Sequence, residues 1–461
     1  MSIRSWAWGN ARRVAKRRIA QLATCAGVVS MGCNGSSSDG TLGDGGVPGA
    51  TGGAPASTGG ASSSTGGAST STGGSTGTGS GATSNGGASG SSSGGTGGSA
   101  HASGGASTGT GGSTASSGGR TNAVDAGDGG AEGGISGPAT VRIVGRTDGD
   151  PSSPRFEWSG VSIQARFRGT SVTMDVDGGN NNYFEVVVDG QIQPLIAGST
   201  GRKMVPVVAG LTSAEHDLTI WRRTEADNYT PTQFYGLDIG GGALLAPAVP
   251  AHKVEVIGDS ITCGYGDEGN GPNCSFSFDT ENNYLAYGSV AARTLDADLY
   301  TECWSGKGMY RNGDGSTDQT LPVLYPLSIP TDTSATWDFS WKPDAVVVDL
   351  GTNDFNTGDP GQPYVNAYES FVTNLRGHYP NAYVFVIIGP MLSGDSLTEA
   401  QTYLDQVVKA RHDAGDQRIQ QILVDPQDSA NGLGCDYHPT VKTHSIMGKA
   451  LAAAMKGPLG W

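Results

Sequence analysis

The stretch VIGDSITCGYG, from Val256 to Gly266, joins a short apolar strand directly to Gly-Asp-Ser. Gly, Asp and Ser are common turn residues, so Ser260 suits a chain reversal. A serine at the carboxyl end of a strand also suits a nucleophile, because active sites of open parallel sheets lie at that edge. The choice depends on the sheet around this strand and on a base and oxyanion donors from elsewhere in the chain.

The sequence around that strand, residues 251–461, alternates apolar runs with helical patterns. The apolar runs are rich in Val and Ile, as strands covered on both faces are: VEVIG (254–258), DAVVVDLG (344–351), AYVFVIIGP (382–390) and QILVD (421–425). Candidate helices lie at 281–297, 364–379, 398–415 and 441–455. Strands that alternate with helices predict a three-layer α/β domain with a mainly parallel sheet.

Residues 139–250 show the pattern of an all-β domain. Short runs alternate apolar and polar residues, as in VSIQARF (161–167) and YFEVVVDG (183–190), and Gly, Asn, Asp and Ser separate them. No helical pattern interrupts these runs. We therefore predict a β-sandwich of the jelly-roll kind before the α/β domain.

The first 138 residues have the composition of an export signal and a tether. A basic segment without acids precedes the short apolar run IAQLATCAGVVSMGC (19–33), in the order of a secretory signal, which we place at residues 1–32. Ser30 to Cys33 resembles a bacterial lipobox, although leucine is usual at Ser30, so both lipidation of Cys33 and ordinary cleavage nearby stay open. Residues 33–138 are almost entirely Gly, Ser, Thr and Ala, which predicts a disordered tether. We expect an extracellular or cell-surface protein.

Charge and cysteine content narrow the possible partners. The first 32 residues hold six positive charges and no acid, so their removal changes the formal net charge from -15 to -21. Such an acidic protein does not attract nucleic acid through its charge. Four cysteines remain after Cys33, and the first expected pairing is Cys263–Cys274 with Cys303–Cys435, one of three that are possible. The sequence has no CxxC motif or His-rich cluster, and we predict neither a metal nor a cofactor.

Three polar clusters converge on the carboxyl edge of the predicted sheet. Ser260 follows one strand, GTNDF (351–355) follows another, and DYHPT (436–440) precedes the last helix. A serine, a histidine and an amide are the groups that acyl transfer needs: a nucleophile, a base that takes its proton, and donors for the developing oxyanion.

The sequence resembles a known family at these positions. GDSIT, SGKG (305–308), GTND and DYHP match, in order, the four blocks of the SGNH or GDSL hydrolases. Together with EWSGVSIQARFRGTSV (157–172) and IWRRTEA (220–226) upstream, they resemble the two-domain acetyl-xylan esterases of carbohydrate esterase family 2. The resemblance extends from about residue 139 to the end of the chain, and it implies the fold predicted above.

The resemblance implies a role for each matching residue. Ser260 would be the nucleophile and His438 the general base. The Ser260 N–H, the Gly306 N–H and the Asn353 side-chain amide would form the oxyanion hole, with Gly308 as the competing glycine. His444 is the alternative base, but it lies inside the expected last helix, where packing or capping is the commoner role of a histidine.

The acid of the expected triad departs from the family pattern. Many members have an acid three residues before the histidine, where this chain has Cys435. Asp436 is the nearest carboxylate, and we predict it as the orienting acid; a backbone carbonyl, and hence a Ser-His dyad, is the alternative. Tyr437 stands where the family often has Trp, which suits contact with a sugar ring. Trp304 either lines the substrate site or packs in the core.

From this pattern we expect an exported serine esterase that removes O-acetyl groups from plant polysaccharides such as xylan or glucomannan. Ester hydrolysis follows from the residues, whereas acetyl and carbohydrate follow from the resemblance. Two alternatives stay open: a lipid or general short-chain GDSL esterase, and a carbohydrate-binding surface protein without turnover.

Overall fold

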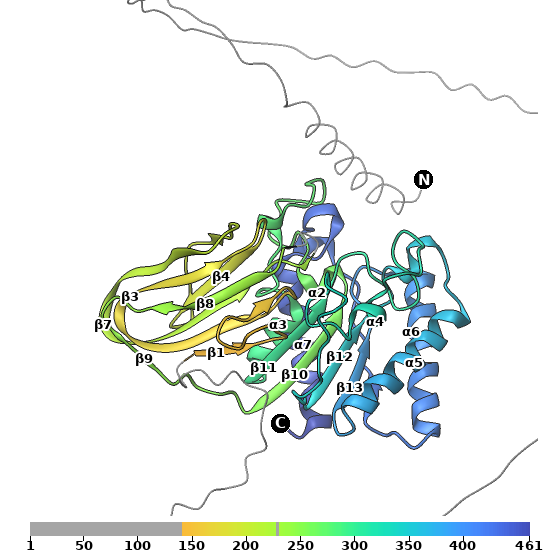
Figure 1. Cartoon of the computed structure of the whole chain (residues 1–461). Coiled ribbons are helices and arrows are strands. Elements are labelled where there is room, and N and C mark those ends of the chain that lie inside the picture. Colours follow the sequence, from red (N-terminus) through yellow and green to blue (C-terminus); the bar gives the residue numbers. More distant parts are fainter. Residues whose placement is uncertain (1–140, 227–229) are drawn as a thin grey trace, which may run out of the picture. The chain divides into compact units, whose positions relative to one another are not determined.

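The computed structural model describes residues 141–226 and 230–461. The predicted signal (1–32), Cys33 and the predicted tether (33–138) lie outside the described residues. The described chain contains an antiparallel β domain followed by an α/β domain, which begins at β10 (His252–Gly258). Figure 1 shows the two domains side by side, with β11 facing the β domain.

The β domain is one antiparallel sheet of nine strands. Its main order is β2-β8-β3-β7-β4-β5, while β1 and β9 pair with β3 and β6 pairs with β4. The long strands β3 and β7 pair along their length with register shifts near Gly169 and Val172, where β-bulges bend the sheet. The strands are β1 (Val141–Val144), β2 (Arg155–Phe156), β3 (Ser162–Asp177), β4 (Tyr183–Val188), β5 (Gln191–Ile192), β6 (Ile196–Ala197), β7 (Lys203–Arg222), β8 (Thr232–Asp238) and β9 (Ala243–Leu245).

The α/β domain has a five-stranded parallel sheet in the order β11-β10-β12-β13-β14. Its further strands are β11 (Ala297–Cys303), β12 (Ala345–Asp349), β13 (Tyr383–Ile387) and β14 (Ile419–Gln421). Its helices are α2 (Ser260–Cys263), α3 (Tyr287–Thr294), α4 (Leu321–Leu324), α5 (Gln362–His378), α6 (Gly394–Asp413) and α7 (Val441–Leu459), with short 3-10 turns at η3 (Phe278–Thr280), η4 (Asp354–Thr357), η5 (Ser429–Asn431) and η6 (Cys435–Tyr437).

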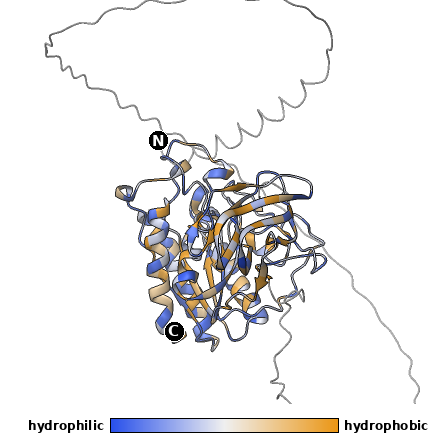
Figure 2. Cartoon of the chain, turned by 90° about the vertical axis from the view of Figure 1, so that its left-hand side faces the viewer, coloured by the Kyte–Doolittle hydropathy of each residue, from blue (hydrophilic) through white to orange (hydrophobic). Residues whose placement is uncertain are grey.

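Alternate residues of the parallel strands face two different helical layers. Val346 and Val348 of β12 pack in the cluster that includes α5 and α6, whereas Val347 packs with α3 and α7. Both faces of the strand are therefore buried, which explains its continuous apolar sequence. Figure 2 shows the same organisation, with hydrophobic segments on the strands and mixed segments along the outer helices. Between residues 141 and 461, no described helix is long and apolar enough to cross a membrane.

The edge strand β11 is covered by charged residues of the β domain. Arg146 is fully buried and forms ion pairs with Glu255 of β10 at 2.8 Å and Glu302 of β11 at 2.9 Å. Arg142 pairs with Asp298, near the start of β11. Removing one partner of such a buried pair leaves an uncompensated charge, so these contacts tie the two domains together.

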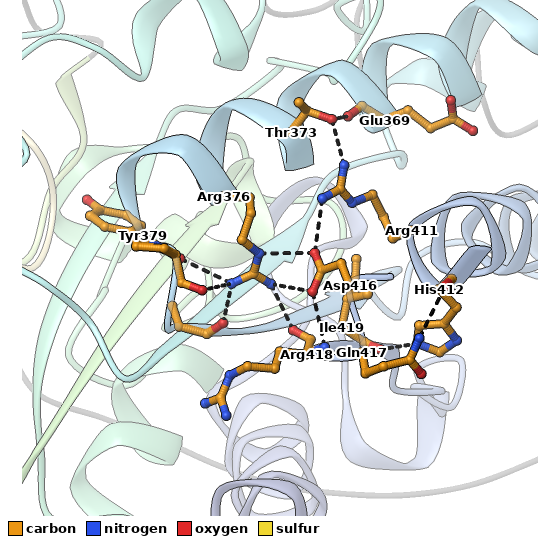
Figure 3. A network of polar contacts seen from close by, with 12 residues as sticks. Glu369, Thr373, Arg376, Tyr379, Arg411, His412, Asp416, Gln417, Arg418 and Ile419 are labelled. Atoms are coloured by element: carbon orange, nitrogen blue, oxygen red, sulfur yellow. Dashed lines mark hydrogen bonds and ion pairs between the residues drawn. The ribbon is translucent and has the colours of Figure 1, made fainter. Parts of the chain in front are cut away.

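A second ionic cluster closes the opposite edge of the sheet, where β14 begins. Arg376 of α5 donates to Asp416 at 3.0 Å, and Arg411 of α6 donates to the same carboxylate at 3.2 Å. Figure 3 shows Asp416 between the two guanidinium groups, beside the segment that leads into Ile419. This cluster joins both outer helices to the amino end of a strand, which leaves the carboxyl ends for the site.

The predicted fold class is confirmed, whereas both expected disulfides are wrong. The structure pairs Cys263 with Cys303, and Cys274 with Cys435. Cys303 ends β11, and β11 pairs with β10 directly before the helix that carries Cys263. Adjacent strand ends therefore place this pair together, although 40 positions separate the two residues.

Candidate active site

Ser260 lies where β10 passes into the short helix α2. Gly258 permits this tight junction, because a Cβ there would lie 1.9 Å from Thr262 Oγ1. Asp259 caps the helix, and its Oδ1 accepts a hydrogen bond from the Ile261 N–H at 3.0 Å. Ser260 is 8% exposed, so the turn holds it in a fixed position with a small part open to solvent.

The His438 imidazole reaches Ser260 from a distant part of the chain. His438 Nε2 lies 2.9 Å from Ser260 Oγ. The preceding residues are fixed to the α/β domain by the Cys274–Cys435 disulfide and by a 3.0 Å hydrogen bond from the Cys435 N–H to the Gly266 carbonyl. In this arrangement an imidazole accepts the proton of an attacking serine.

Asp436 makes no hydrogen bond to this imidazole, which corrects its expected role. Its Oδ2 accepts hydrogen bonds from the Tyr265 hydroxyl at 2.9 Å and from the Phe276 N–H at 3.1 Å. His438 Nδ1 is buried, and no hydrogen bond of regular geometry reaches it within the described residues. The acceptors near the ring are the carbonyl groups of Cys435 and Asp436. The contacts therefore favour the dyad alternative.

The surroundings of His438 set its protonation state. Loss of solvation lowers the pKa of His438 from 6.5 to about 4, and the Asp436 charge and the two nearby carbonyl groups offset only part of this effect. The imidazole is therefore neutral near pH 7, which is the state that a general base requires. The Tyr265 ring packs against it with centroids 4.2 Å apart, and the Phe276 ring stacks on Tyr265 at 4.3 Å.

His444, the alternative base, has a different partner. Its Nδ1 accepts a hydrogen bond from the N–H of Tyr287, the first residue of α3, at 3.2 Å. The side chain is fully buried in α7, and burial lowers its pKa to about 3. His444 thus satisfies an N–H at a helix start, and within the described part of the chain the hydrogen bond to the Ser260 hydroxyl comes from His438 and not from His444.

Two backbone N–H groups are available for an oxyanion. Neither the Ser260 N–H nor the Gly306 N–H donates to an acceptor within residues 141–226 and 230–461. Gly306 has a φ of +80°, a conformation that favours glycine. The Gly308 N–H already donates to Asn312 Oδ1 at 3.3 Å, which favours Gly306 over Gly308 as the donor.

Asn353 connects the segments that carry these two N–H groups. Its Nδ2 donates to Asp259 Oδ2 and to the Lys307 carbonyl, each at 3.0 Å. Asp259 directly precedes Ser260, and Lys307 directly follows Gly306. The amide thus lies beside both predicted backbone donors, although its two N–H groups have acceptors of their own that an acyl oxygen would have to share.

Asp259 belongs to a buried acidic pair rather than to the reacting groups. Burial is the first cause that raises its pKa well above the usual value, and the neighbouring Asp349 adds to this. Burial likewise raises the pKa of Asp349 to about 7. Asp259 therefore braces the turn through Ile261 and Asn353.

The two aromatic candidates differ in position. Trp304 is 7% exposed and packs in the core, so it offers no open ring face to a sugar. Tyr437 is partly exposed beside His438, in a left-handed conformation with a φ of +67°. Its contact with a substrate stays a prediction.

One buried group resembles a metal site in its residue types. Ligand atoms of Glu225, Cys263 and Glu281 lie within 4.8 Å of one another. Cys263 is bonded to Cys303, and a disulfide sulfur is not the thiolate that metal ions bind. We assign no metal to these residues.

Comparison with known proteins extends the assignment to both domains. Residues 143–248 match the family Carbohydrate esterase 2 N-terminal, and residues 256–446 match the GDSL-like Lipase/Acylhydrolase family. The chain is 38% identical over 321 residues to the cellulase/esterase CelE of Acetivibrio thermocellus, across 69% of this chain and 39% of CelE. It therefore spans well under half of that relative. An acetylxylan esterase / glucomannan deacetylase of Cellvibrio japonicus is 28% identical over 330 residues, across 70% of this chain and 89% of that protein.

Solved structures give the same result. A family two carbohydrate esterase from Clostridium thermocellum, in complex with cellohexaose, is 37% identical with a TM-score of 0.66, across 70% of this chain and 99% of that one. A family two carbohydrate esterase from Cellvibrio japonicus is 27% identical with a TM-score of 0.64, across 71% of this chain and 97% of that one.

The Ser260–His438 pair lies at the carboxyl edge of the parallel sheet, and residues 256–446 match the GDSL-like family. Both observations define a carboxylic ester hydrolase of the GDSL type. Relatives of this class that also carry the upstream β domain form a narrower group. The chain belongs to that group, carbohydrate esterase family 2.

Proposed function

We propose that this chain hydrolyses O-acetyl esters on plant polysaccharides such as xylan and glucomannan. The observation that carries the proposal is the 2.9 Å contact between His438 Nε2 and Ser260 Oγ at a sheet edge with two available N–H groups. The relatives named for acetylxylan and glucomannan support the acetyl group and the polysaccharide. The relative solved with cellohexaose supports a carbohydrate chain as ligand.

The first half of the reaction transfers the acetyl group to the enzyme. His438 Nε2 takes the proton of Ser260 Oγ as the oxygen attacks the acetyl carbonyl carbon. Negative charge develops on the carbonyl oxygen, and the N–H groups of Ser260 and Gly306, together with the Asn353 amide, donate to it. The bond between the acetyl carbon and the sugar oxygen then breaks, and His438 gives its proton to that oxygen, so that the sugar leaves with a free hydroxyl.

The second half regenerates the enzyme. Water gives a proton to His438 and attacks the acetyl-serine carbonyl, where the same donors stabilise the new oxyanion. The bond to Ser260 Oγ breaks, the serine regains its proton from His438, and acetate leaves. A dyad performs these steps if the carbonyl groups of Cys435 and Asp436 stabilise the imidazolium that forms.

Acetate release from acetylated xylan, acetylated glucomannan and a long-chain lipid ester, measured side by side, tests the proposal. We expect acetate from the polysaccharides, and none above background from Ser260→Ala. Turnover of the lipid ester alone would favour a lipid esterase instead. Binding to the polysaccharides without acetate release would favour a non-catalytic surface protein.

We also propose that the protein is exported and held at the cell surface through Cys33 and residues 33–138. Support comes from the order of basic, apolar and low-complexity segments in the sequence. Labelling with a radioactive fatty acid in a bacterial host tests this. We expect label on the wild-type chain and not on Cys33→Ser; label on neither would remove the lipid anchor.

A further inference from the structure

The loop Ser305–Arg311, called the oxyanion loop here because it carries the Gly306 N–H, is held at both ends by carboxylates. At its downstream end, Asp354 accepts hydrogen bonds from three consecutive N–H groups, those of Met309, Tyr310 and Arg311, at 2.8 to 2.9 Å. Asp354 directly follows Asn353, so the α/β domain supplies this support itself. The upstream end of the loop is supported from a different domain.

The upstream support comes from the β domain. The Ser305 N–H donates to Glu225 Oε2 at 2.5 Å, and Glu225 lies three residues beyond β7. Glu225 is 1% exposed, so water does not compete for this hydrogen bond. The Ser305 hydroxyl is buried without a hydrogen-bond partner in the described chain, which leaves the N–H as the polar group that anchors the residue. Ser305 directly precedes Gly306.

Glu225 is itself fixed by contacts from both domains. Its N–H donates to Glu281 Oε2 of the α/β domain at 3.1 Å. Its carbonyl accepts a hydrogen bond from the Arg222 guanidinium at 3.3 Å, and that guanidinium also donates to Thr232 Oγ1 at 3.0 Å. Burial of a carboxylate costs free energy unless the group is hydrogen-bonded. The hydrogen bond from the Ser305 N–H therefore gives a reason for a glutamate at this junction of the two domains.

We propose that Glu225 is a positioning residue for the oxyanion hole. Its carboxylate holds the Ser305 peptide and thereby directs the adjacent Gly306 N–H at the acyl oxygen. Stabilisation by such a donor depends on placement before the reaction begins, and small displacements are costly. The β domain then contributes a side chain that positions a group of the catalytic centre. This inference rests on the proposed ester hydrolysis.

The decisive pair of variants is Glu225→Met and Glu225→Gln in the full chain. The two side chains have nearly the same length, but only Gln keeps an oxygen that accepts from the Ser305 N–H. Arg142→Ala is the control for domain contact, because it removes the ion pair with Asp298 at the other end of β11. All variants are compared by thermal unfolding, by kcat and KM on a soluble acetyl ester, and by inhibition with methylboronic acid, which forms a tetrahedral adduct on a nucleophilic serine.

We expect Glu225→Met to lower kcat by roughly 10- to 100-fold with KM within about threefold, because the lost interaction acts in the transition state. Boronate inhibition should weaken in parallel. Glu225→Gln should stay within about threefold of wild type in kcat, and Arg142→Ala should leave kcat unchanged. If Glu225→Met does not fold, Glu225→Asp takes its place, because its shorter side chain keeps the charge and loses the reach.

Three results would overturn the inference. They are an unchanged kcat in a folded Met or Asp variant, an equal loss in Glu225→Gln, and an equal loss in Arg142→Ala. The failure of the proposed function is distinguishable, because the wild-type chain would then release no acetate at all.

Discussion

The hydroxyl of Tyr265 donates a hydrogen bond to Asp436 Oδ2 across 2.9 Å. The ring of the same tyrosine lies against the His438 imidazole, with centroids 4.2 Å apart. Asp436 therefore holds an aromatic ring against the general base and acts on the imidazole through its charge, without a direct hydrogen bond to it. Its carboxylate also accepts the Phe276 N–H, so it fixes two of the aromatic residues beside the catalytic pair.

Asp436→Asn separates this arrangement from a triad. The asparagine oxygen still accepts from Tyr265 or Phe276, so we expect kcat to fall by about tenfold or less. In the best-studied triad the same change costs about 10⁴-fold, because the imidazole takes the wrong tautomer. Turnover on a soluble acetyl ester, with circular dichroism as the control for folding, measures the difference. A loss of about 10³-fold or more would restore Asp436 as the orienting acid.

The pH dependence of kcat/KM reports the protonation of His438 in the free enzyme. Its pKa is lowered to about 4, so the neutral base persists to lower pH than for an ordinary histidine. Activity is present above this pKa and is lost as the pH falls through it, because a protonated imidazole cannot accept the Ser260 proton. We expect the acid limb near pH 4; a limb near 6.5 would contradict the role of burial.

Asp436→Asn also has an expected effect on this profile. The Asp436 charge raises the pKa of His438 against the larger effect of burial. Its removal should therefore move the acid limb to lower pH and not to higher pH. The same variant thus gives two independent readings, one from the rate and one from the profile.

Asn353→Ala tests the side-chain donor of the oxyanion hole. Loss of one such donor lowers kcat by roughly 10²- to 10³-fold in a well-studied serine protease, and we expect a similar loss with a smaller change in KM. Asn366→Ala in α5 is the matched control, because Asn366 contacts Gln362 and lies outside the site. An unchanged kcat in Asn353→Ala would reduce Asn353 to a link between Asp259 and Lys307.

Removal of each disulfide is expected to lower the free energy of unfolding by a different amount. Peptide mapping without reduction should give Cys263–Cys303 and Cys274–Cys435. The two bridges span 40 and 161 positions, and each doubling of a closed loop adds about 0.6 kcal/mol of entropic stabilisation. Replacing Cys274 and Cys435 by serine should therefore cost about 1 kcal/mol more in denaturant unfolding than replacing Cys263 and Cys303. The reverse order would contradict the entropic account.

The sequence predicted those strands that consist almost entirely of apolar residues. The runs at 254–258, 344–351 and 382–390 contain β10, β12 and β13, because strands covered on both faces have little room for polar side chains. The run at 421–425 only overlaps β14, which ends at Gln421. Strand β11 was missed, because Asp298 and Glu302 are typical of an exposed segment. Both are buried against arginines of the β domain, and a local pattern cannot show a partner from another domain.

The residues of the candidate site likewise fall into those that the sequence could predict and those that it could not. Ser260 and His438 each stand in a short motif, so sequence found both, and the structure brings them into contact. Tyr265, Phe276 and Glu225 have no motif that marks them as neighbours of the site. Their placement depends on the Cys274–Cys435 bridge and on the junction of the domains, which are properties of the folded chain.

Replacing each histidine separately tests the assignment of the base. His444→Ala leaves the buried Tyr287 N–H without its acceptor, which costs about 1–3 kcal/mol of stability. We expect this variant to melt at a lower temperature and to keep kcat within about tenfold of wild type. His438→Ala should instead keep its stability and lose several orders of magnitude in kcat, because Ser260 then has no proton acceptor. The reverse order would transfer the catalytic role to His444.

Ser260→Ala combined with His438→Ala shows whether the two residues act as a unit. Two groups that serve one step are strongly non-additive, so the double variant should be no slower than either single variant. Independent roles would instead multiply the two losses. The measurement is kcat on a soluble acetyl ester with enough enzyme to detect a residual rate, and circular dichroism confirms that each variant is folded. A further loss of about 10²-fold or more in the double variant would mean that His438 contributes to a step without Ser260, and the 2.9 Å contact would then not be the catalytic pair.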